Sequence, residues 1–213
     1  MMNEQEIRPA GSNSKQTTGE RGHLFIISAP SGGGKTTLSK AVVNRFKDII
    51  YSVSYTTRSP RNSEQDGVDY YFISKKDFKD RIESGYWAEW AKVHGNYYGT
   101  SGEFLEKGLA SGRDILLDID VQGTRRILED YPDSITIFIM PPSLETLRKR
   151  LEMRGTESRA TIKRRLLTAE KEMAQKHLYR YIIINDQLSA SIEKLAAIIE
   201  KYRYPDKFKK CLK

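Results

Sequence analysis

The sequence is poor in cysteine, because Cys211 is the only cysteine among 213 residues. A single thiol cannot form a disulfide within the chain, which excludes a secreted scaffold held together by disulfides. This cysteine usage is typical of a reducing compartment, so we expect a cytoplasmic protein in which Cys211 is an inert thiol.

Long hydrophobic runs are also missing. The longest apolar stretches, residues 24–27 and 134–140, are far shorter than the roughly 20 residues of a transmembrane helix. Residues 1–22 are polar and contain no apolar segment of signal-peptide length. We therefore expect no membrane association, and we interpret residues 1–22 as a disordered leader.

Charge is unbalanced, with 36 Lys and Arg against 28 Asp and Glu, a formal net charge of +8. A basic surface attracts phosphates, so nucleic acid and a small phosphorylated substrate are both candidate partners, and charge alone does not separate them. Binding to nucleic acid would predict an affinity that collapses with salt. The basic residues are dispersed among the acids, and their cluster at 207–210 is short, so we expect no nucleic-acid partner.

Strand-like and helical patterns alternate along most of the chain. The strand-like runs are 23–28, 114–120, 134–140 and 181–184, and the helical patterns are 36–46, 122–128, 143–154, 160–178 and 191–202. This alternation predicts an α/β fold whose parallel sheet is covered by helices on both faces.

A tyrosine-rich segment, residues 52–101, interrupts the alternation. It contains strand-like runs at 69–73 and 86–93, separated by a helix that Ser74 can cap and that Gly85 can end. We interpret this segment as an insertion at the edge of the sheet.

A glycine-rich loop follows the first strand and matches the P-loop pattern, except that alanine replaces the leading glycine. The backbone N–H groups of such a loop surround phosphate oxygens at the amino end of the next helix. Its lysine can reach the β- and γ-phosphates, and the adjacent threonine hydroxyl can ligate Mg²⁺. The motif therefore predicts a nucleoside triphosphate site made of Ala29, Pro30, Ser31, Gly32, Gly33, Gly34, Lys35, Thr36 and Thr37.

A P-loop site also needs a carboxylate near the metal, usually at the end of another buried strand. Asp118 and Asp120 follow the apolar run 115–117 and are candidates, although either could instead cap the next helix. We expect Asp118 to act on Mg²⁺ through a water molecule.

Two further features suit a second, nucleotide-like substrate. Arg58 and Arg61 suit a monophosphate, because guanidinium groups grip phosphate bidentately; the alternative is a solvated arginine surface. Glu89 could accept from both N1–H and the exocyclic amine of guanine, donors that adenine does not carry together. The alternative for Glu89 is an exposed acid on an edge strand.

Taken together, the motifs resemble guanylate kinase from about residue 23 to residue 202. They occur in one order at 29–36, 52–61, 67–70, 89–91, 95–99, 117–123, 150–157 and 184–186. The resemblance implies a three-layer P-loop fold with a parallel core sheet, an inserted GMP-binding subdomain and a mobile helical lid. The implied division is a leader at 1–22 and a kinase domain at 23–213, with core segments 23–53, 102–143 and 171–213, insertion 54–101 and lid 144–170.

The resemblance also implies roles for individual residues. The lid arginines would close over the transferring phosphoryl group together with Lys35, and Asn185 would lie beside the adenine of ATP. Arg180 departs from the family, which commonly has an acid before Tyr181. The implied lid arginines are Arg150, Arg154 and Arg165; the implied GMP-binding residues are Ser54, Glu89 and Thr100 at guanine with Asp120 close by, and Arg58, Arg61, Tyr70 and Tyr98 at the phosphate.

The implied activity is transfer of the γ-phosphoryl group of ATP to GMP and dGMP with Mg²⁺ as cofactor, in purine nucleotide metabolism and GMP recycling. Guanylate-kinase-like domains of scaffolding proteins keep the fold but bind other proteins, so a binding module is the alternative. The presence of Lys35, three P-loop glycines and the lid arginines, with no neighbouring interaction domain visible, favours the enzyme. ATP and GMP are then the expected partners, and no oligomeric state is predicted.

Overall fold

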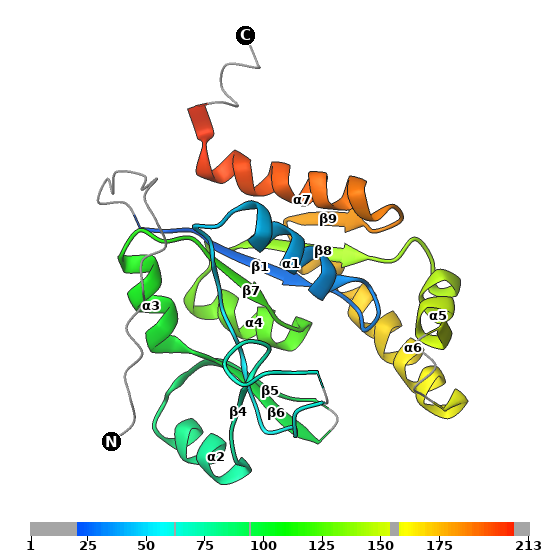
Figure 1. The fold of residues 1–213 in the computed structure, drawn as a ribbon, viewed down its shortest axis with the longest axis horizontal. Coiled ribbons are helices and arrows are strands. Elements are labelled where there is room, and N and C mark those ends of the chain that lie inside the picture. Colours follow the sequence, from blue (N-terminus) through cyan, green and yellow to red (C-terminus); the bar gives the residue numbers. More distant parts are fainter. Residues whose placement is uncertain (1–20, 62, 94, 154–157, 207–213) are drawn as a thin grey trace.

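A computed structural model describes residues 21–61, 63–93, 95–153 and 158–206. Within these residues, parallel strands form a sheet in the order β2-β7-β1-β8-β9, which confirms the parallel sheet predicted from the alternating pattern (Figure 1). The strands are β1 (Leu24–Ser28), β2 (Ile50–Tyr51), β7 (Ile115–Asp118), β8 (Ile135–Met140) and β9 (Tyr181–Ile184).

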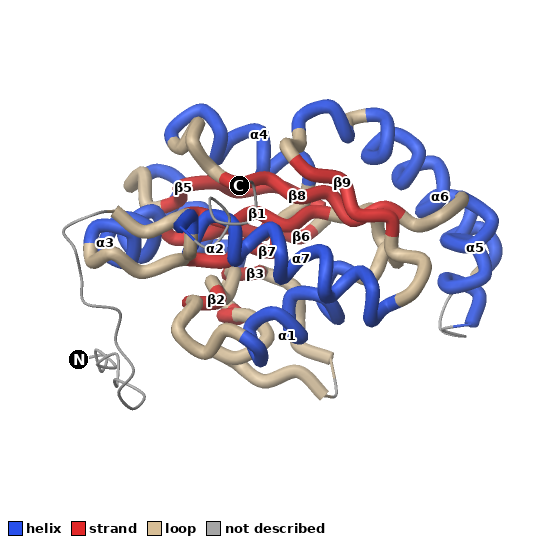
Figure 2. The backbone as a smooth tube through the Cα atoms, turned by 90° about the horizontal axis from the view of Figure 1, so that it is seen from above, coloured by secondary structure: helices blue, strands red, loops and turns tan. Residues whose placement is uncertain are grey.

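Helices cover both faces of this sheet, as Figure 2 shows. Side chains of β1 alternate between the faces: Phe25 and Ile27 pack beneath α1 (Lys35–Arg45) and α7 (Leu188–Arg203). Leu24 and Ile26 pack beneath α3 (Gly102–Ala110) and α4 (Val121–Asp130). Each of these large side chains contributes about 1.5–3 kcal/mol when fully buried, so the uninterrupted apolar strands fix the three-layer arrangement.

The tyrosine-rich segment forms a second sheet in the order β4-β3-β6-β5. The chain leaves the core after β2, an edge strand, and returns through α3, which agrees with an insertion at the sheet's edge. Its hydrophobic centre is a stack in which the Phe78 ring lies 4.3 Å from that of Trp87 and 5.2 Å from that of Tyr97. The elements are β3 (Tyr55–Thr56), β4 (Tyr71–Phe72), α2 (Lys75–Glu83), β5 (Trp87–Val93) and β6 (Asn96–Ser101).

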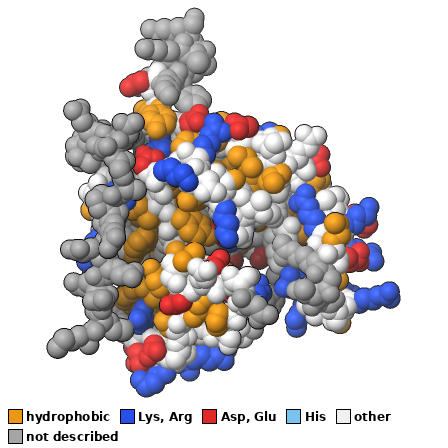
Figure 3. Space-filling view, viewed as in Figure 1, with side chains coloured by type: hydrophobic (Ala, Val, Ile, Leu, Met, Phe, Trp, Pro, Cys, Tyr) orange, Lys and Arg blue, Asp and Glu red, His pale blue; other side chains and the backbone are white. Residues whose placement is uncertain are grey.

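Two helices, α5 (Leu144–Met153) and α6 (Arg159–Ala174), form the segment expected to be a lid. They pack through Leu147, Leu151 and Ile162, and Lys and Arg side chains gather on their outer surface (Figure 3). The helix predicted at 160–178 ends earlier, at Ala174, and a 3-10 turn η1 (Lys176–Leu178) follows. The turn brings Tyr179 into the core, where its ring lies 4.8 Å from that of Phe138.

At the amino ends of the parallel strands, a partly buried charge network joins four segments. Arg203 at the end of α7 is 5% exposed, and its Nε donates to Asp114 Oδ2 at 2.8 Å. Arg203 also pairs with Asp48, and the backbone N–H of His23 donates to Asp114 Oδ1 at 2.8 Å. Although burial alone would raise the pKa of Asp114, these partners lower it. The network fastens the carboxyl-terminal helix to the sheet.

Several expectations fall outside the described residues: the leader up to residue 20, Arg154 of the lid and Cys211. The subdomain boundaries remain predictions. Across the described ranges, the structure contains no helix long and apolar enough to cross a membrane.

Candidate functional site

The carboxyl ends of β1 and β7 open into a cavity of about 330 Å³, here called the transfer cavity. The core, the inserted sheet and α6 each contribute a wall. A second cavity of about 270 Å³, the arginine cavity, adjoins it and shares Ser54, Tyr70, Tyr98 and Asp118 with it. Parallel α/β sheets bind ligands at this end of their strands. The shared residues make the two cavities one continuous candidate site.

The predicted P-loop connects β1 to α1 and borders the transfer cavity through Ala29, Ser31 and Lys35. Gly34 has a φ of 99°, in the left-handed region that favours glycine. A Cβ at Gly34 would also lie 2.3 Å from Nδ2 of Asn185, which donates to the carbonyl oxygen of Gly33 at 3.0 Å. Asn185, expected at the adenine, therefore supports the loop directly.

Lys35 and Asp118 form an ion pair; Lys35 lines the transfer cavity, and Asp118 lines both cavities. Burial alone would lower the pKa of Lys35, but the Asp118 carboxylate raises it, so the ammonium stays charged. The other Asp118 oxygen accepts from Ser39 Oγ at 3.1 Å. The hydroxyl of Tyr51 also bonds to Asp118, and burial raises the pKa of Tyr51. Sequence reasoning missed Ser39 and Tyr51, because no motif marks either residue.

Asp120 has the capping role that the sequence offered as an alternative, and it also lies at the candidate site. Its side chain caps α4 by accepting from the backbone N–H of Gly123 at 2.8 Å. It also lines the transfer cavity beside Glu89 and Lys35. Capping fixes its carboxylate in place, so any role toward a ligand uses a pre-positioned group.

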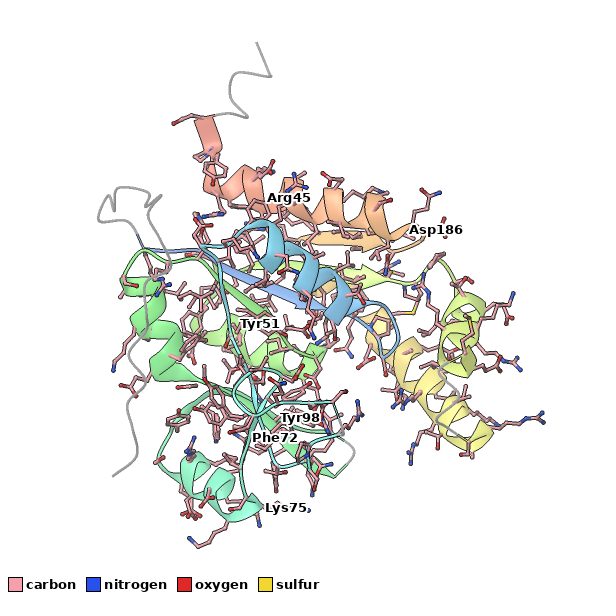
Figure 4. All side chains as sticks on the ribbon, viewed as in Figure 1. Arg45, Tyr51, Phe72, Lys75, Tyr98 and Asp186 are labelled. Atoms are coloured by element: carbon pink, nitrogen blue, oxygen red, sulfur yellow. The ribbon has the colours of Figure 1, made fainter. Side chains whose placement is uncertain are left out.

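Arg58 and Arg61 both line the arginine cavity, together with Tyr70 and Tyr98. The Arg58 guanidinium donates to the two oxygens of Glu64 at 2.9 and 2.8 Å, and the backbone N–H of Arg61 donates to Glu64 at 2.8 Å. Arg58 also lies 5.4 Å from the centre of the Tyr70 ring. Glu64, which sequence reasoning missed, holds both arginines at the cavity. Figure 4 shows Tyr51 near the core sheet and Tyr98 on the inserted sheet.

Glu89 lies on β5 and is 5% exposed, so the exposed-acid alternative is excluded. Its Oε1 accepts from Thr100 Oγ1 of β6 at 2.7 Å. Burial raises the pKa of Glu89 to about 7; the Asp120 charge adds to this rise, whereas Thr100, Arg126 and Lys35 oppose it. The structure thus brings together Ser54, Glu89 and Asp120 in the lining of the transfer cavity, with Thr100 bonded to Glu89.

Helix α6 contributes Arg165, Thr168 and Glu172 to the transfer cavity. Burial, with the Asp120 charge, raises the pKa of Glu172 to about 7, and the Lys35 charge and the Ser31 backbone N–H oppose this rise. Glu172 was not expected from the sequence. Several predicted residues line neither cavity; among them, Thr37 is exposed on α1, and Arg150 donates to the carbonyl oxygen of Asn185 at 2.8 Å. The others are Pro30, Gly32, Gly33, Gly34, Thr100 and Asn185.

Comparison with known proteins gives one consistent family. The family model described as guanylate kinase matches residues 21–202. The guanylate kinase of Geobacter metallireducens is 49% identical over 178 residues, which cover 84% of this chain and 88% of the relative. That of Caldanaerobacter subterraneus is 46% identical over 180 residues, covering 84% and 87%. The crystal structure of guanylate kinase from Anaplasma phagocytophilum matches with a TM-score of 0.73 and 32% identity, over 87% of this chain and 88% of that chain.

Proposed function

The chain belongs to the guanylate kinase family, and on that premise we propose that it transfers the γ-phosphoryl group of ATP to GMP within the transfer cavity. ATP binds with its phosphates on the P-loop, and GMP binds between the inserted sheet and the core. The observation that carries the proposal is the buried carboxylate of Glu89 in the cavity that also contains the P-loop lysine. The proposal includes dGMP as a second acceptor.

The ATP half of the site is supported by the P-loop geometry. The loop turns so that α1 begins directly beneath it, and the amino end of a helix favours phosphate. Lys35 is the buried cation there, and it is released from Asp118 when the phosphates take over as its partners. Asn185 borders the adenine and Arg165 approaches the transferring group from α6.

The GMP half divides between the two cavities. Arg58, Arg61, Tyr70 and Tyr98 hold the phosphate in the arginine cavity, where Glu64 already orders Arg58. The base enters the transfer cavity, where Glu89 accepts from the N1–H and the exocyclic amine of guanine. Adenine presents a lone pair at N1 to the same carboxylate and is repelled, which makes the site selective for guanine.

Mg²⁺ is the cofactor in this proposal, and the residues present fit it. Mg²⁺ prefers oxygen ligands and is commonly held by one or two carboxylates together with substrate phosphates. The Thr36 hydroxyl and the Asp118 carboxylate, the latter through water, supply such oxygens at the arginine cavity. In the described residues no cluster of three or more metal-binding side chains occurs, which agrees with a metal bound largely by the nucleotide. When bound, the ion neutralises phosphate charge.

The reaction itself requires positioning and charge compensation more than covalent chemistry. Lys35 and the lid arginines follow the negative charge as the phosphoryl group moves, and closure of α5 and α6 excludes water that would hydrolyse ATP. No general base is required, because the accepting phosphate is already anionic. A cytoplasmic location belongs to the proposal and is supported by the single cysteine.

A coupled assay that measures ADP formation tests the proposal directly. The full chain is given ATP and Mg²⁺ with GMP, dGMP, AMP, CMP or UMP in turn. We expect turnover with GMP and dGMP that exceeds turnover with the other three by at least about 100-fold, because a site built to hydrogen-bond one base rejects analogues that leave its buried polar groups unpaired. Equal rates with AMP would refute the guanine assignment, and no ADP with any acceptor would refute the kinase assignment.

A further inference from the structure

Helix α4 lies directly behind Glu89 and is in contact with strand β5 through Gly123 and Arg126. Gly123 is buried, and a Cβ placed on it would lie 2.6 Å from Oε2 and 3.1 Å from Cδ of Glu89. The same added atom would also lie 3.4 Å from Cβ of Ile119, so it would be confined between Glu89 and Ile119. The close approach of the Glu89 carboxylate to α4 therefore depends on glycine at position 123.

Arg126 ties the neighbouring residue of β5 to the same helix. Its guanidinium carbon lies 4.6 Å from the centre of the Trp90 ring, and its Nη1 donates to the Trp90 carbonyl oxygen. Since Trp90 follows Glu89 in the strand, this contact fixes the backbone that carries the carboxylate. Arg126 thus connects the inserted sheet to the core immediately beside the proposed guanine pocket.

The groups that face Glu89 come from every element packed against it. Thr100 of β6 donates a hydrogen bond, and Asp120 before α4 favours the neutral carboxyl group. Arg126 of α4 and Lys35 of α1 favour the ionised form. Arg165 and Glu172 of α6 line the same cavity from the lid side. Of these two cations, Arg126 lowers the Glu89 pKa more than Lys35 does.

We propose that Gly123 and Arg126 are positioning residues for guanine recognition: Gly123 admits the Glu89 carboxylate against α4, and Arg126 fixes the β5 backbone that carries it. Neither residue needs to touch a substrate. This inference rests on the proposed function and adds that base selectivity is set by a core helix behind the pocket. The same helix begins three residues after Asp118, so it also links the guanine pocket to the proposed metal-binding edge.

The first test replaces Arg126 by methionine, which keeps the length and removes the charge. Arg125→Met is the matched control, because Arg125 is the preceding residue of α4 and is exposed. We expect Arg126→Met to raise the KM for GMP by roughly 5- to 30-fold at pH 7 and to leave the KM for ATP unchanged. The acid limb of kcat/KM for GMP should also move upward by about one pH unit, because loss of a nearby cation raises a carboxyl pKa.

A merely structural role for Arg126 would lower the melting temperature or the rate without moving that acid limb. An unmoved limb and an unchanged KM for GMP in an active Arg126→Met enzyme would overturn its assigned role. If the wild type and Arg125→Met both fail to phosphorylate GMP, the proposed function fails instead. GMP titration by calorimetry without ATP provides a reading of binding that is independent of turnover.

The second test is Gly123→Ala, measured alone and in a Glu89→Asp background. Alanine ordinarily stabilises a helix relative to glycine, so weaker GMP binding without a lower melting temperature would isolate the contact with Glu89. We expect the KM for GMP to rise about tenfold in the wild-type background, as for loss of a well-placed charged hydrogen bond. In the Glu89→Asp background the same substitution should add less than twofold, because the shorter carboxylate no longer reaches residue 123. Equal penalties in both backgrounds would overturn the role assigned to Gly123.

Discussion

Replacing Glu89 by glutamine should stabilise the nucleotide-free protein and, at the same time, weaken its recognition of GMP. The carboxyl group is 5% exposed, and burial raises its pKa from 4.5 to about 7. Each pKa unit corresponds to about 1.4 kcal/mol, so keeping this group ionised at pH 8 destabilises the fold by about 3 kcal/mol. Glutamine removes that cost and still offers an oxygen to Thr100.

The amide of glutamine introduces two donors in place of an acceptor, and leaving one unpaired costs about 1–2 kcal/mol. A net stabilisation of about 1–2 kcal/mol remains, which corresponds to a rise in melting temperature of roughly 2–8 °C for a chain of this size. This stabilisation of the glutamine variant relative to the wild type should decrease as the pH falls. Between pH 4.5 and 7 the folded protein holds a proton that the unfolded chain has released, so the wild type becomes relatively more stable as the pH falls.

Recognition of GMP should change in the opposite direction. Loss of a hydrogen bond to a charged acceptor costs about 1.5–3 kcal/mol, which lowers kcat/KM for GMP roughly 10- to 150-fold. The KM for ATP should stay the same, because the P-loop contacts are untouched. In the wild type, the KM for GMP should rise as the pH falls below about 7, since protonation of Glu89 removes the acceptor; the glutamine variant should lose that dependence.

Thermal unfolding at pH 8 and pH 5 and steady-state kinetics across the same range provide the assay. Glu129→Gln is the control, because Glu129 is an exposed acid on α4 and should change neither property. A glutamine variant that melts at or below the wild-type temperature at pH 8 would show that the ionised Glu89 carboxylate does not destabilise the fold. An unchanged KM for GMP would remove Glu89 from the base pocket.

Three further predictions concern other parts of the molecule. Lys35→Ala should lower kcat by roughly 10³-fold or more without changing the circular dichroism spectrum. The control Lys47→Ala, at an exposed site, should keep full activity. If Lys35→Ala retained more than about a tenth of the rate, the P-loop assignment would be contradicted. Arg203→Met should destabilise the fold by about 3 kcal/mol, because it leaves buried Asp114 without its main cation, and the exposed Lys201→Met should leave the melting temperature essentially unchanged; equal melting of both variants would refute the role of the network. ATP analogue and GMP together should reduce the radius of gyration, as the inserted sheet and α5–α6 approach each other, and identical scattering with and without both ligands would argue against closure.

The alternating pattern predicted the parallel sheet and its helices because buried strands and amphipathic helices are local properties of the sequence. The elements that were not predicted include β2, β6 and α3. The β6 segment is rich in tyrosine and contains Gly99, which packs against Phe78 and Trp87, so its strand character depends on partners from elsewhere in the insertion. For α3 the signal was present, because Ser101 caps the helix and Leu105 and Leu109 share one face.

Sequence by itself determined the phosphate-binding loop, because the P-loop is one continuous segment whose glycines, lysine and following helix have meaning without the rest of the chain. It also indicated the family, because the ordered series of short motifs can be recognised without the fold. Only the tertiary structure decided that Glu89 is buried and that its pKa is raised to about 7, since both depend on α4, Asp120 and Arg126. It also decided that Tyr51 and Ser39 bond to Asp118 and that Glu64 orders Arg58. A carboxylate's charge, reach and partners depend on the low-dielectric surroundings that distant segments create by packing, and no local pattern records them.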